Sequence, residues 1–161
     1  MMNRIKVGMA DYKVAVAPDI LMTIGLGSCV GITLYDPVLK IGGMAHIMLP
    51  CSAHYSNNFN KAKFADTAIE ILLKELIEMG AVTRRLVSKI AGGARMFEIR
   101  STDERMKIGE RNVEAATKVL ESKGIPIVAK DVGGTYGRTI ELNLEDGSLL
   151  VKTIGHGEKI L

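Results

Sequence analysis

The sequence predicts an α+β fold, a layered sandwich of mostly antiparallel β-sheet with two main helices packed on it. Three observations lead to this prediction: alternating apolar runs fill both ends of the chain, two runs with helical spacing lie between them, and Gly, Pro and Asp separate the strands. The chain has 161 residues, of which 47% are hydrophobic and 24% charged. This composition is sufficient for a single domain, residues 1–161, with its own core.

The N-terminal third of the chain is predicted to consist of strands. Apolar and β-branched residues are frequent here, and Pro18-Asp19 is typical of a turn. A hairpin follows, whose turn begins at Asp36-Pro37 because Pro favours the second position of a β-turn. The expected strands cover residues 5–9, 12–17, 21–24, 30–36 and 40–48.

The middle of the chain is predicted to hold both helices. In residues 59–79 the apolar side chains recur every three or four positions, and Gly80 ends the pattern. A second helix is expected over residues 104–123 and is closed by Gly124. Residues 85–91, between the two helices, are predicted to form a strand.

The C-terminal part returns to strands, which we expect at residues 125–132, 138–144 and 149–154. The run 145–148, Glu-Asp-Gly-Ser, strongly predicts a hairpin turn. The glycine-rich run from Gly133 superficially resembles a phosphate loop, but it lies between two strands and lacks the Gly-Lys-Ser/Thr ending. We interpret it as a glycine-assisted bend.

Composition and charge argue against several classes of function. The formal net charge is only +3, Lys and Arg are scattered and aromatic residues make up 4%, so we expect no nucleic-acid partner. The uncharged stretch 20–35 is shorter than the roughly 20 apolar residues of a membrane helix, and no direct membrane insertion is expected. The N-terminus lacks the apolar region of a signal peptide, which predicts a cytoplasmic protein with free thiols at Cys29 and Cys51.

Cys29 and His46 are the residues that first suggest a chemical activity. If Pro37 and Val38 form the hairpin loop, Cys29 lies directly opposite His46, with Cβ atoms about 4.5–5.5 Å apart. A thiol facing an imidazole is the minimal equipment for nucleophilic catalysis. A bulge at Gly42-Gly43 would change this register. In the predicted register one face of the hairpin is mixed and glycine-rich, whereas the other is expected to be core: Val30, Ile32, Leu34, Ile41, Ala45 and Ile47.

The glycine-rich run before Cys29 adds to this interpretation. Backbone N–H groups at Gly27 and Ser28 would be free to favour the thiolate and to stabilise an oxyanion. Thr23 lies near the same loop and would orient the His46 ring or bind substrate. Each side chain also has a purely structural interpretation: a small buried thiol, a hydrogen-bonded histidine, and a threonine that favours a strand.

Two further features leave alternatives open. Cys51 and His54 have a Cys-x-x-His spacing and, with Cys29 and His46, make a conceivable zinc site. Met96 and Phe97 follow two glycines, so these apolar side chains are either core or a contact for a protein partner.

Ordered blocks along nearly the whole chain resemble the CheD family of chemoreceptor glutamine deamidases. The family's functional residues are a Cys, a His and an upstream Thr, and the matching positions here are Cys29, His46 and Thr23. The blocks are Gly-Leu-Gly-Ser-Cys29-Val, Leu34-Tyr-Asp-Pro37, Gly42-Gly-Met-Ala-His46-Ile-Met-Leu-Pro50, Lys89-Ile-Ala-Gly-Gly-Ala-Arg-Met-Phe97, Ile108-Gly-Glu-Arg-Asn112, Gly124-Ile-Pro-Ile-Val128 and Asp131-Val-Gly-Gly134 through Gly137-Arg138.

The resemblance implies a fold akin to cysteine-dependent toxin deamidases and a reaction at glutamine side chains of methyl-accepting chemotaxis receptors. Cys29 would attack the carboxamide, His46 would move the proton, and water would hydrolyse the thioester to glutamate and release ammonia. No metal or organic cofactor is implied. The family also commonly binds CheC, a response-regulator phosphatase, for which Met96 and Phe97 are candidate contacts. The competing hypotheses are a non-enzymatic chemotaxis adaptor that binds receptor or phosphatase and a small zinc-binding protein.

Overall fold

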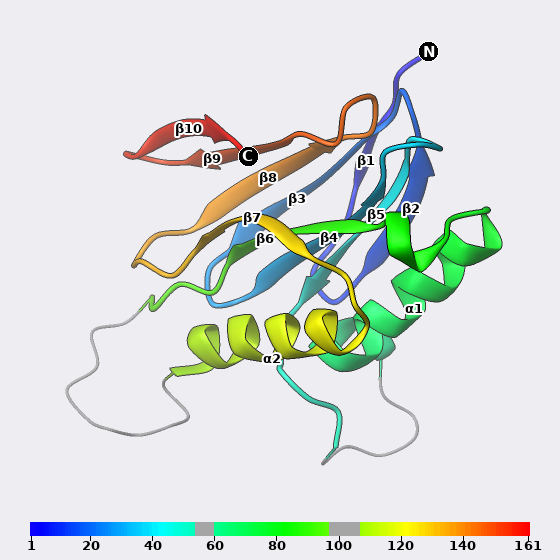
Figure 1. The fold of residues 1–161 in the computed structure, drawn as a ribbon. Coiled ribbons are helices and arrows are strands. Elements are labelled where there is room, and N and C mark those ends of the chain that lie inside the picture. Colours follow the sequence, from blue (N-terminus) through cyan, green and yellow to red (C-terminus); the bar gives the residue numbers. More distant parts are fainter. Residues whose placement is uncertain (54–59, 97–106) are drawn as a thin grey trace.

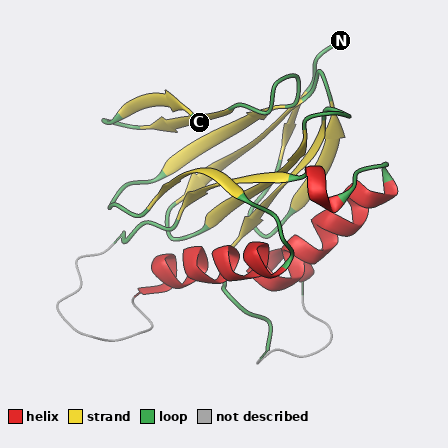
Figure 2. Ribbon diagram, in the orientation of Figure 1, coloured by secondary structure: helices red, strands yellow, loops and turns green. Residues whose placement is uncertain are grey.

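The protein is built of three layers, two stacked five-stranded sheets and a pair of helices on the outer side of one sheet (Figures 1 and 2). The computed structural model describes residues 1–53, 60–96 and 107–161. Strands from both ends of the chain meet in one sheet, while both helices come from the middle of the sequence. The predicted α+β class with two main helices is confirmed.

We call the sheet between the other two layers the central sheet. Its strands, in spatial order, are β2 (Tyr12–Val16), β5 (Ile41–Ile47), β4 (Val30–Asp36), β6 (Val87–Gly92) and β7 (Ile127–Val132). The outer sheet consists of β1 (Arg4–Lys6), β3 (Ile20–Leu26), β8 (Arg138–Asn143), β9 (Leu149–Thr153) and β10 (Gly157–Ile160). Neighbouring strands run antiparallel except in the pairs β1–β3 and β6–β7.

Both helices begin later than the sequence pattern predicts. Helix α1 covers Ala65–Glu78, and a separate 3₁₀ turn, Lys61–Lys63, precedes it. Helix α2 covers Ile108–Ser122, and the expected residues 104–106 lie outside the described part of the chain. A second 3₁₀ turn, Thr83–Arg85, precedes β6. None of the helices in the described ranges has the length and apolar character needed to cross a membrane.

The central sheet is buried on both faces. Every residue of β4 and β5 is buried. The six residues predicted to be core all pack in the cluster formed with the helices, which confirms that face assignment. They are Val30, Ile32 and Leu34 on β4 and Ile41, Ala45 and Ile47 on β5. The opposite face, which is mixed and glycine-rich as predicted, is also buried, because Met44 and Tyr35 pack there against the outer sheet. A site on this face therefore lies between the two sheets.

The predicted hairpin register is wrong by two residues. The structure pairs Gly31 with His46 and Val30 with Ile47. Because the shift is even, each side chain keeps its predicted face. Cys29 thus lies diagonally from His46 instead of opposite it, a relation that places Cα atoms about 7–8 Å apart in a regular pair of strands.

The cause of the shift is the turn between β4 and β5, which has four residues instead of two. The Asp36 carboxylate accepts hydrogen bonds from the N–H groups of Val38 (2.9 Å) and Leu39 (3.2 Å). The backbone carbonyl of Asp36 accepts a further hydrogen bond from the Lys40 N–H (2.8 Å). Burial opposes ionisation of this carboxyl, but the Arg85 guanidinium and the turn amides outweigh it and lower the pKa of Asp36. The carboxylate therefore holds the longer turn closed.

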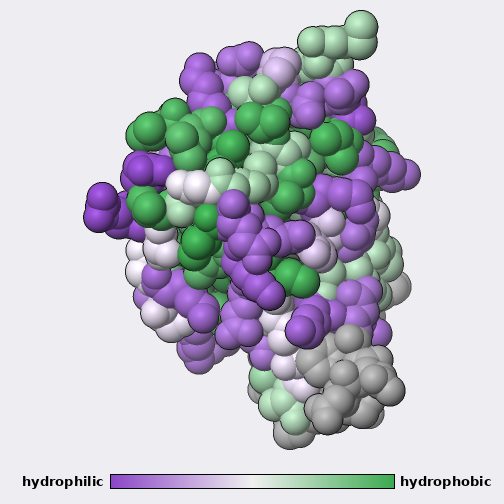
Figure 3. Space-filling view, turned by 90° about the vertical axis from the view of Figure 1, so that its right-hand side faces the viewer, coloured by the Kyte–Doolittle hydropathy of each residue, from purple (hydrophilic) through white to green (hydrophobic). Residues whose placement is uncertain are grey.

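Two other segments differ in how well the sequence predicts them. The glycine run after β7 is a bend, as predicted, and both Gly133 and Gly134 have positive φ angles. Strand β10 was not expected, because all four of its residues are exposed and it has no apolar alternation. Figure 3 views the molecule from the right-hand side of Figure 1 and shows hydrophobic residues interspersed with hydrophilic ones on that surface.

Candidate active site

Cys29 ends a three-residue loop, 27–29, that joins β3 of the outer sheet to β4 of the central sheet. Each carbonyl group of this loop accepts a hydrogen bond from another part of the chain. The donors are Ala94 N–H to Gly27 (2.9 Å), Asn112 Nδ2 to Ser28 (3.0 Å) and Gly93 N–H to Cys29 (2.9 Å). The loop is therefore fixed from its carbonyl side.

The N–H groups of the loop are less engaged than its carbonyl groups. The Gly27 N–H donates to the Gly25 carbonyl at 3.1 Å. Within the described ranges, the N–H groups of Ser28 and Cys29 donate to no other residue, and the Cys29 N–H interacts with its own sulfur. Of the two predicted oxyanion donors, Ser28 is thus the one whose N–H group has no acceptor among the described residues.

His46 is held in one tautomer by Thr23. The imidazole Nδ1 lies 2.7 Å from Thr23 Oγ1, and this hydroxyl also lies 2.7 Å from the Val7 carbonyl oxygen. Since the hydroxyl has one proton and must donate it to the carbonyl, it accepts from Nδ1–H. Nε2 then carries the free lone pair. His46 is fully buried, and its Nε2 has no hydrogen-bond partner among the residues described.

Cys29 and His46 lie on the same face of the central sheet without a hydrogen bond between them. Cys29 belongs to the apolar cluster between the sheets and is 8% exposed. His46 points from β5 towards Thr23 on β3, which is part of the outer sheet. The thiol and the imidazole therefore occupy the same intersheet layer, and catalytic hydrogen bonds are often long before substrate binds.

Burial keeps both groups neutral in the resting protein. It raises the pKa of the Cys29 thiol, and the cysteine's own backbone N–H offsets only part of this effect. Burial also lowers the pKa of His46. The expectation that the loop would favour a thiolate is not met in the resting protein, since the site holds a thiol and a neutral imidazole in place of an ion pair.

Asn112 was not predicted to belong to the site. It lies in the first part of α2, is fully buried, and donates hydrogen bonds from Nδ2 to the carbonyl groups of Ser28 and Met48, both at 3.0 Å. Residue spacing alone cannot show this contact, because Asn112 and Ser28 are 84 positions apart. The only indication in the sequence was the Ile108-to-Asn112 block of the family resemblance.

The candidate partner contact is partly described. Met96 is 47% exposed, and its side chain lies against Gly27, where an added Cβ would come within 3.1 Å of Met96 Cγ. Phe97 lies outside the described residues.

Three residues of the conceivable zinc site, Cys29, His46 and Cys51, lie in the described part of the chain, and they do not form a metal-binding group there. Cys29 is buried and Cys51 is exposed, and both thiols are free, as predicted. His54 falls outside the described ranges. Among residues 1–53, 60–96 and 107–161, no three His, Cys, Asp or Glu side chains are grouped so that they would hold a metal ion.

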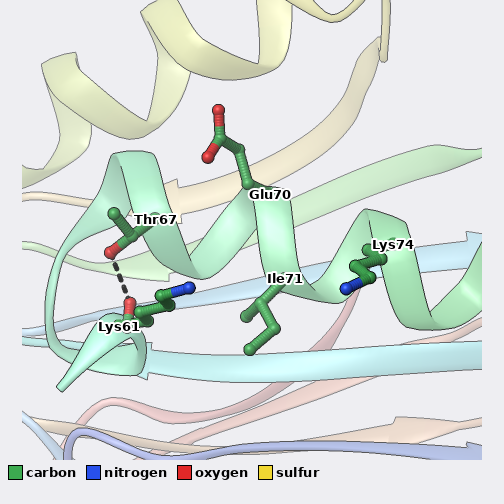
Figure 4. Close-up of a pocket in the computed structure, with 5 residues that line it drawn as sticks. All are labelled: Lys61, Thr67, Glu70, Ile71 and Lys74. Atoms are coloured by element: carbon green, nitrogen blue, oxygen red, sulfur yellow. Dashed lines mark hydrogen bonds between the residues drawn. The ribbon is translucent and has the colours of Figure 1, made fainter.

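A pocket on α1 contains none of the predicted site residues (Figure 4). Thr67 Oγ1 donates to the Lys61 carbonyl at its rim, and the remaining lining residues are Glu70, Ile71 and Lys74. This pocket is lined by charged groups but by no cysteine or histidine.

Comparisons with known proteins identify a family to which the chain is similar. A family model described as "CheD chemotactic sensory transduction" matches residues 48–153. The chain is 61% identical over 157 residues to the "Probable chemoreceptor glutamine deamidase CheD" of Caldanaerobacter subterraneus subsp. tengcongensis, covering 98% of this chain and 97% of that protein. It is 52% identical over 160 residues to the "Chemoreceptor glutamine deamidase CheD" of Halalkalibacterium halodurans, covering 99% of each.

Among solved structures, a chain described as the hypothetical protein YfiH of Bacillus licheniformis matches 78% of this chain and 50% of its own length. The TM-score is 0.47 and the sequence identity 18%.

Proposed function

We propose that this chain, which belongs to the CheD family, is a protein-glutamine deamidase that converts glutamine side chains of chemoreceptors to glutamate. The names of its relatives support the substrate class. The observation that carries the proposal is the buried His46. Its Nδ1–H is held by Thr23, and its Nε2, on the face that also bears Cys29, has no hydrogen-bond partner in the part of the chain that the structure describes.

The reaction begins with a proton transfer and a nucleophilic attack. His46 Nε2 accepts the Cys29 thiol proton while the sulfur bonds to the carboxamide carbon of the substrate glutamine. The carbonyl oxygen becomes an oxyanion, for which the free Ser28 N–H is a donor. The imidazolium then gives its proton to the nitrogen, and ammonia leaves as the carbonyl group re-forms. The product of this half-reaction is a thioester on Cys29.

Hydrolysis of the thioester returns the enzyme to its starting state. His46 Nε2 removes a proton from water, the hydroxide attacks the thioester carbon, and the Cys29 sulfur recovers a proton from the imidazolium as it leaves. Thr23 keeps Nε2 as the acceptor through both halves, because its hydroxyl accepts only from Nδ1–H. No step needs a metal or organic cofactor.

Neutral resting groups suit this mechanism. A neutral imidazole is required as the base, and burial lowers the pKa of His46 so that it stays unprotonated at neutral pH. Cys29 is 8% exposed, so only a small part of its surface is open to a substrate, which favours a narrow side chain over a bulky one. A glutamine side chain, which is unbranched and ends in a planar amide, meets that requirement.

We further propose that a CheC-type phosphatase binds at Met96 and Phe97. The exposure of Met96 and its contact with Gly27 support a partner surface next to the nucleophile loop. The Met96→Glu variant should bind such a phosphatase more weakly in a pull-down with the purified partner. Equal binding by this variant and the unmodified protein would exclude Met96 from the contact.

Ammonia release from purified chemoreceptor cytoplasmic fragments tests the proposed function. The unmodified protein should release ammonia and convert glutamine to glutamate, as measured by mass spectrometry. Cys29→Ala and His46→Ala should each abolish release, while Cys51→Ala, the matched control at the other free thiol, should retain it. Binding of several receptors without ammonia release would instead favour the adaptor, and near-stoichiometric zinc bound through Cys29 would favour the zinc protein.

A further inference from the structure

Asn112 connects the two segments that carry the proposed nucleophile and base. Its Nδ2 donates to the carbonyl of Ser28, the residue before Cys29. The same nitrogen donates to the carbonyl of Met48, two residues after His46. Both distances are 3.0 Å, so one amide nitrogen spans the gap between the end of β5 and the start of β4.

The chemistry of this position requires two donors on a single atom. A primary amide nitrogen has two N–H groups, and each can point to one carbonyl. A hydroxyl group has one such proton and a carboxylate has none. Asn112 Oδ1 is buried without a hydrogen-bond partner in the described part of the chain, so the polar contacts of this side chain come from Nδ2. Asparagine acts here as a clamp between two carbonyl groups.

The helix that carries Asn112 is itself fixed to the nucleophile loop. A Cβ added at Gly109 would lie 2.5 Å from the Ala94 carbonyl oxygen, so α2 touches the segment after β6 with no side chain between them. That segment, Gly93-Ala94, donates in turn to the carbonyl groups of Cys29 and Gly27. The start of α2 and the loop are therefore braced by backbone contact as well as by the Asn112 side chain.

We propose that Asn112 is a positioning residue that sets the separation between Cys29 Sγ and His46 Nε2. It touches neither reacting atom and acts through Ser28 and Met48. This inference rests on the proposed deamidase function. It assigns to α2 a part in the reaction, beyond the packing of its apolar face on the central sheet.

The test compares Asn112→Asp with Leu120→Ala in the full chain. The aspartate keeps the shape of the side chain but has no donor when ionised and one when neutral, so at least one of the two hydrogen bonds is lost. Leu120 is buried in the core on the same helix, and its hydrocarbon side chain cannot hydrogen-bond to the loop, which makes Leu120→Ala a control for loss of helix packing. We expect Asn112→Asp to lower kcat for ammonia release by about 100-fold at an unchanged KM, because a small displacement of reacting groups has that effect. Leu120→Ala should lower the unfolding temperature and leave kcat per folded molecule unchanged.

The possible results are distinct. If Asn112→Asp matches the unmodified protein in kcat, or if Leu120→Ala loses as much, the inference is wrong. If Asn112→Asp does not fold, Asn112→Ser decides, because it retains one donor on a shorter side chain and should also lower kcat and not KM. If the unmodified protein releases no ammonia, the proposed function fails and the inference fails with it.

Discussion

At the scale of single residues, the state of the His46 imidazole follows from one hydroxyl group. Thr23 donates its only proton to the Val7 carbonyl and is left as an acceptor for Nδ1–H. Thr23 thus fixes the tautomer of the proposed base, His46, from a different sheet. Removing the hydroxyl should free the ring to turn and to adopt the other tautomer.

Thr23→Val tests that role because valine keeps the β-branched shape. We expect kcat to fall by roughly 100-fold, since misplaced catalytic groups lose rate on that scale. Thr33→Val is the matched control: Thr33 also donates a hydroxyl hydrogen bond to a carbonyl, that of Lys89 at 2.9 Å, and is equally buried. Both variants should lose about 1 kcal/mol of stability. Equal activity in the two variants would contradict the role of Thr23.

The pH dependence of the reaction follows from the same residue. The base must be neutral, and burial lowers the pKa of His46 below the ordinary value of 6.5. Protonation therefore needs a lower pH than for an exposed histidine, so the acid limb of kcat/KM should be centred below pH 6.5. A pH–rate profile of ammonia release measures this. An acid limb centred above pH 6.5 would contradict a buried neutral base.

At the scale of elements, the backbone at the end of β6 is in direct contact with the backbone of the loop that carries Cys29. Gly92 has a φ of 113°, and a Cβ added there would lie 2.3 Å from the Cys29 carbonyl oxygen. Neither the angle nor the space admits a side chain. The position of Cys29 therefore depends on β6, a strand that contains none of the proposed catalytic residues.

Gly92→Ala should thus lose both stability and activity. Gly124→Ala is its matched control, because Gly124 also has a positive φ, 72°, yet nothing lies within 4 Å of an added Cβ. The control should lose about 1 kcal/mol from backbone strain alone and keep its kcat. Urea unfolding and ammonia release measure both effects. Indistinguishable behaviour of the two variants would show that the Gly92 contact does not position Cys29.

The β4–β5 hairpin and the Asn112 contact show which features the sequence could predict and why others were missed. Alternation correctly assigned the two faces of the β4–β5 hairpin, because burial imposes a period of two on the residues. It could not give the register, since a shift of two residues preserves every face and the turn length depends on the Asp36 side chain. The family resemblance pointed to Thr23, Cys29 and His46. The Asn112 contact spans 84 positions and leaves no local pattern.

At the scale of the whole molecule, the candidate site lies where the two sheets pack together. Thr23 comes from the outer sheet, His46 from the central sheet, and Cys29 from the loop that joins them. The central sheet is held in place on its other face by α1 and α2. The geometry of the site thus depends on the packing of all three layers.

Ile32→Ala tests the contribution of the helix-facing core. Ile32 is fully buried in the cluster shared by the central sheet and the helices, so truncation should lower the free energy of unfolding by about 2–5 kcal/mol. Val38→Ala, in the turn at the end of the same strand, is the control: its side chain is 67% exposed, and the change should stay within about 0.5 kcal/mol. Urea denaturation measures both. A small effect at Ile32 would contradict the three-layer core.

The central claim is that the Cys29 sulfur becomes bonded to the substrate. Acid quenching of a turnover mixture of the protein with a chemoreceptor cytoplasmic fragment, followed by mass spectrometry, measures this directly. We predict a thioester between the fragment and Cys29 in the unmodified protein and in Cys51→Ala, and none in Cys29→Ala. Conversion of receptor glutamine to glutamate by Cys29→Ala, with no adduct in any variant, would contradict the account.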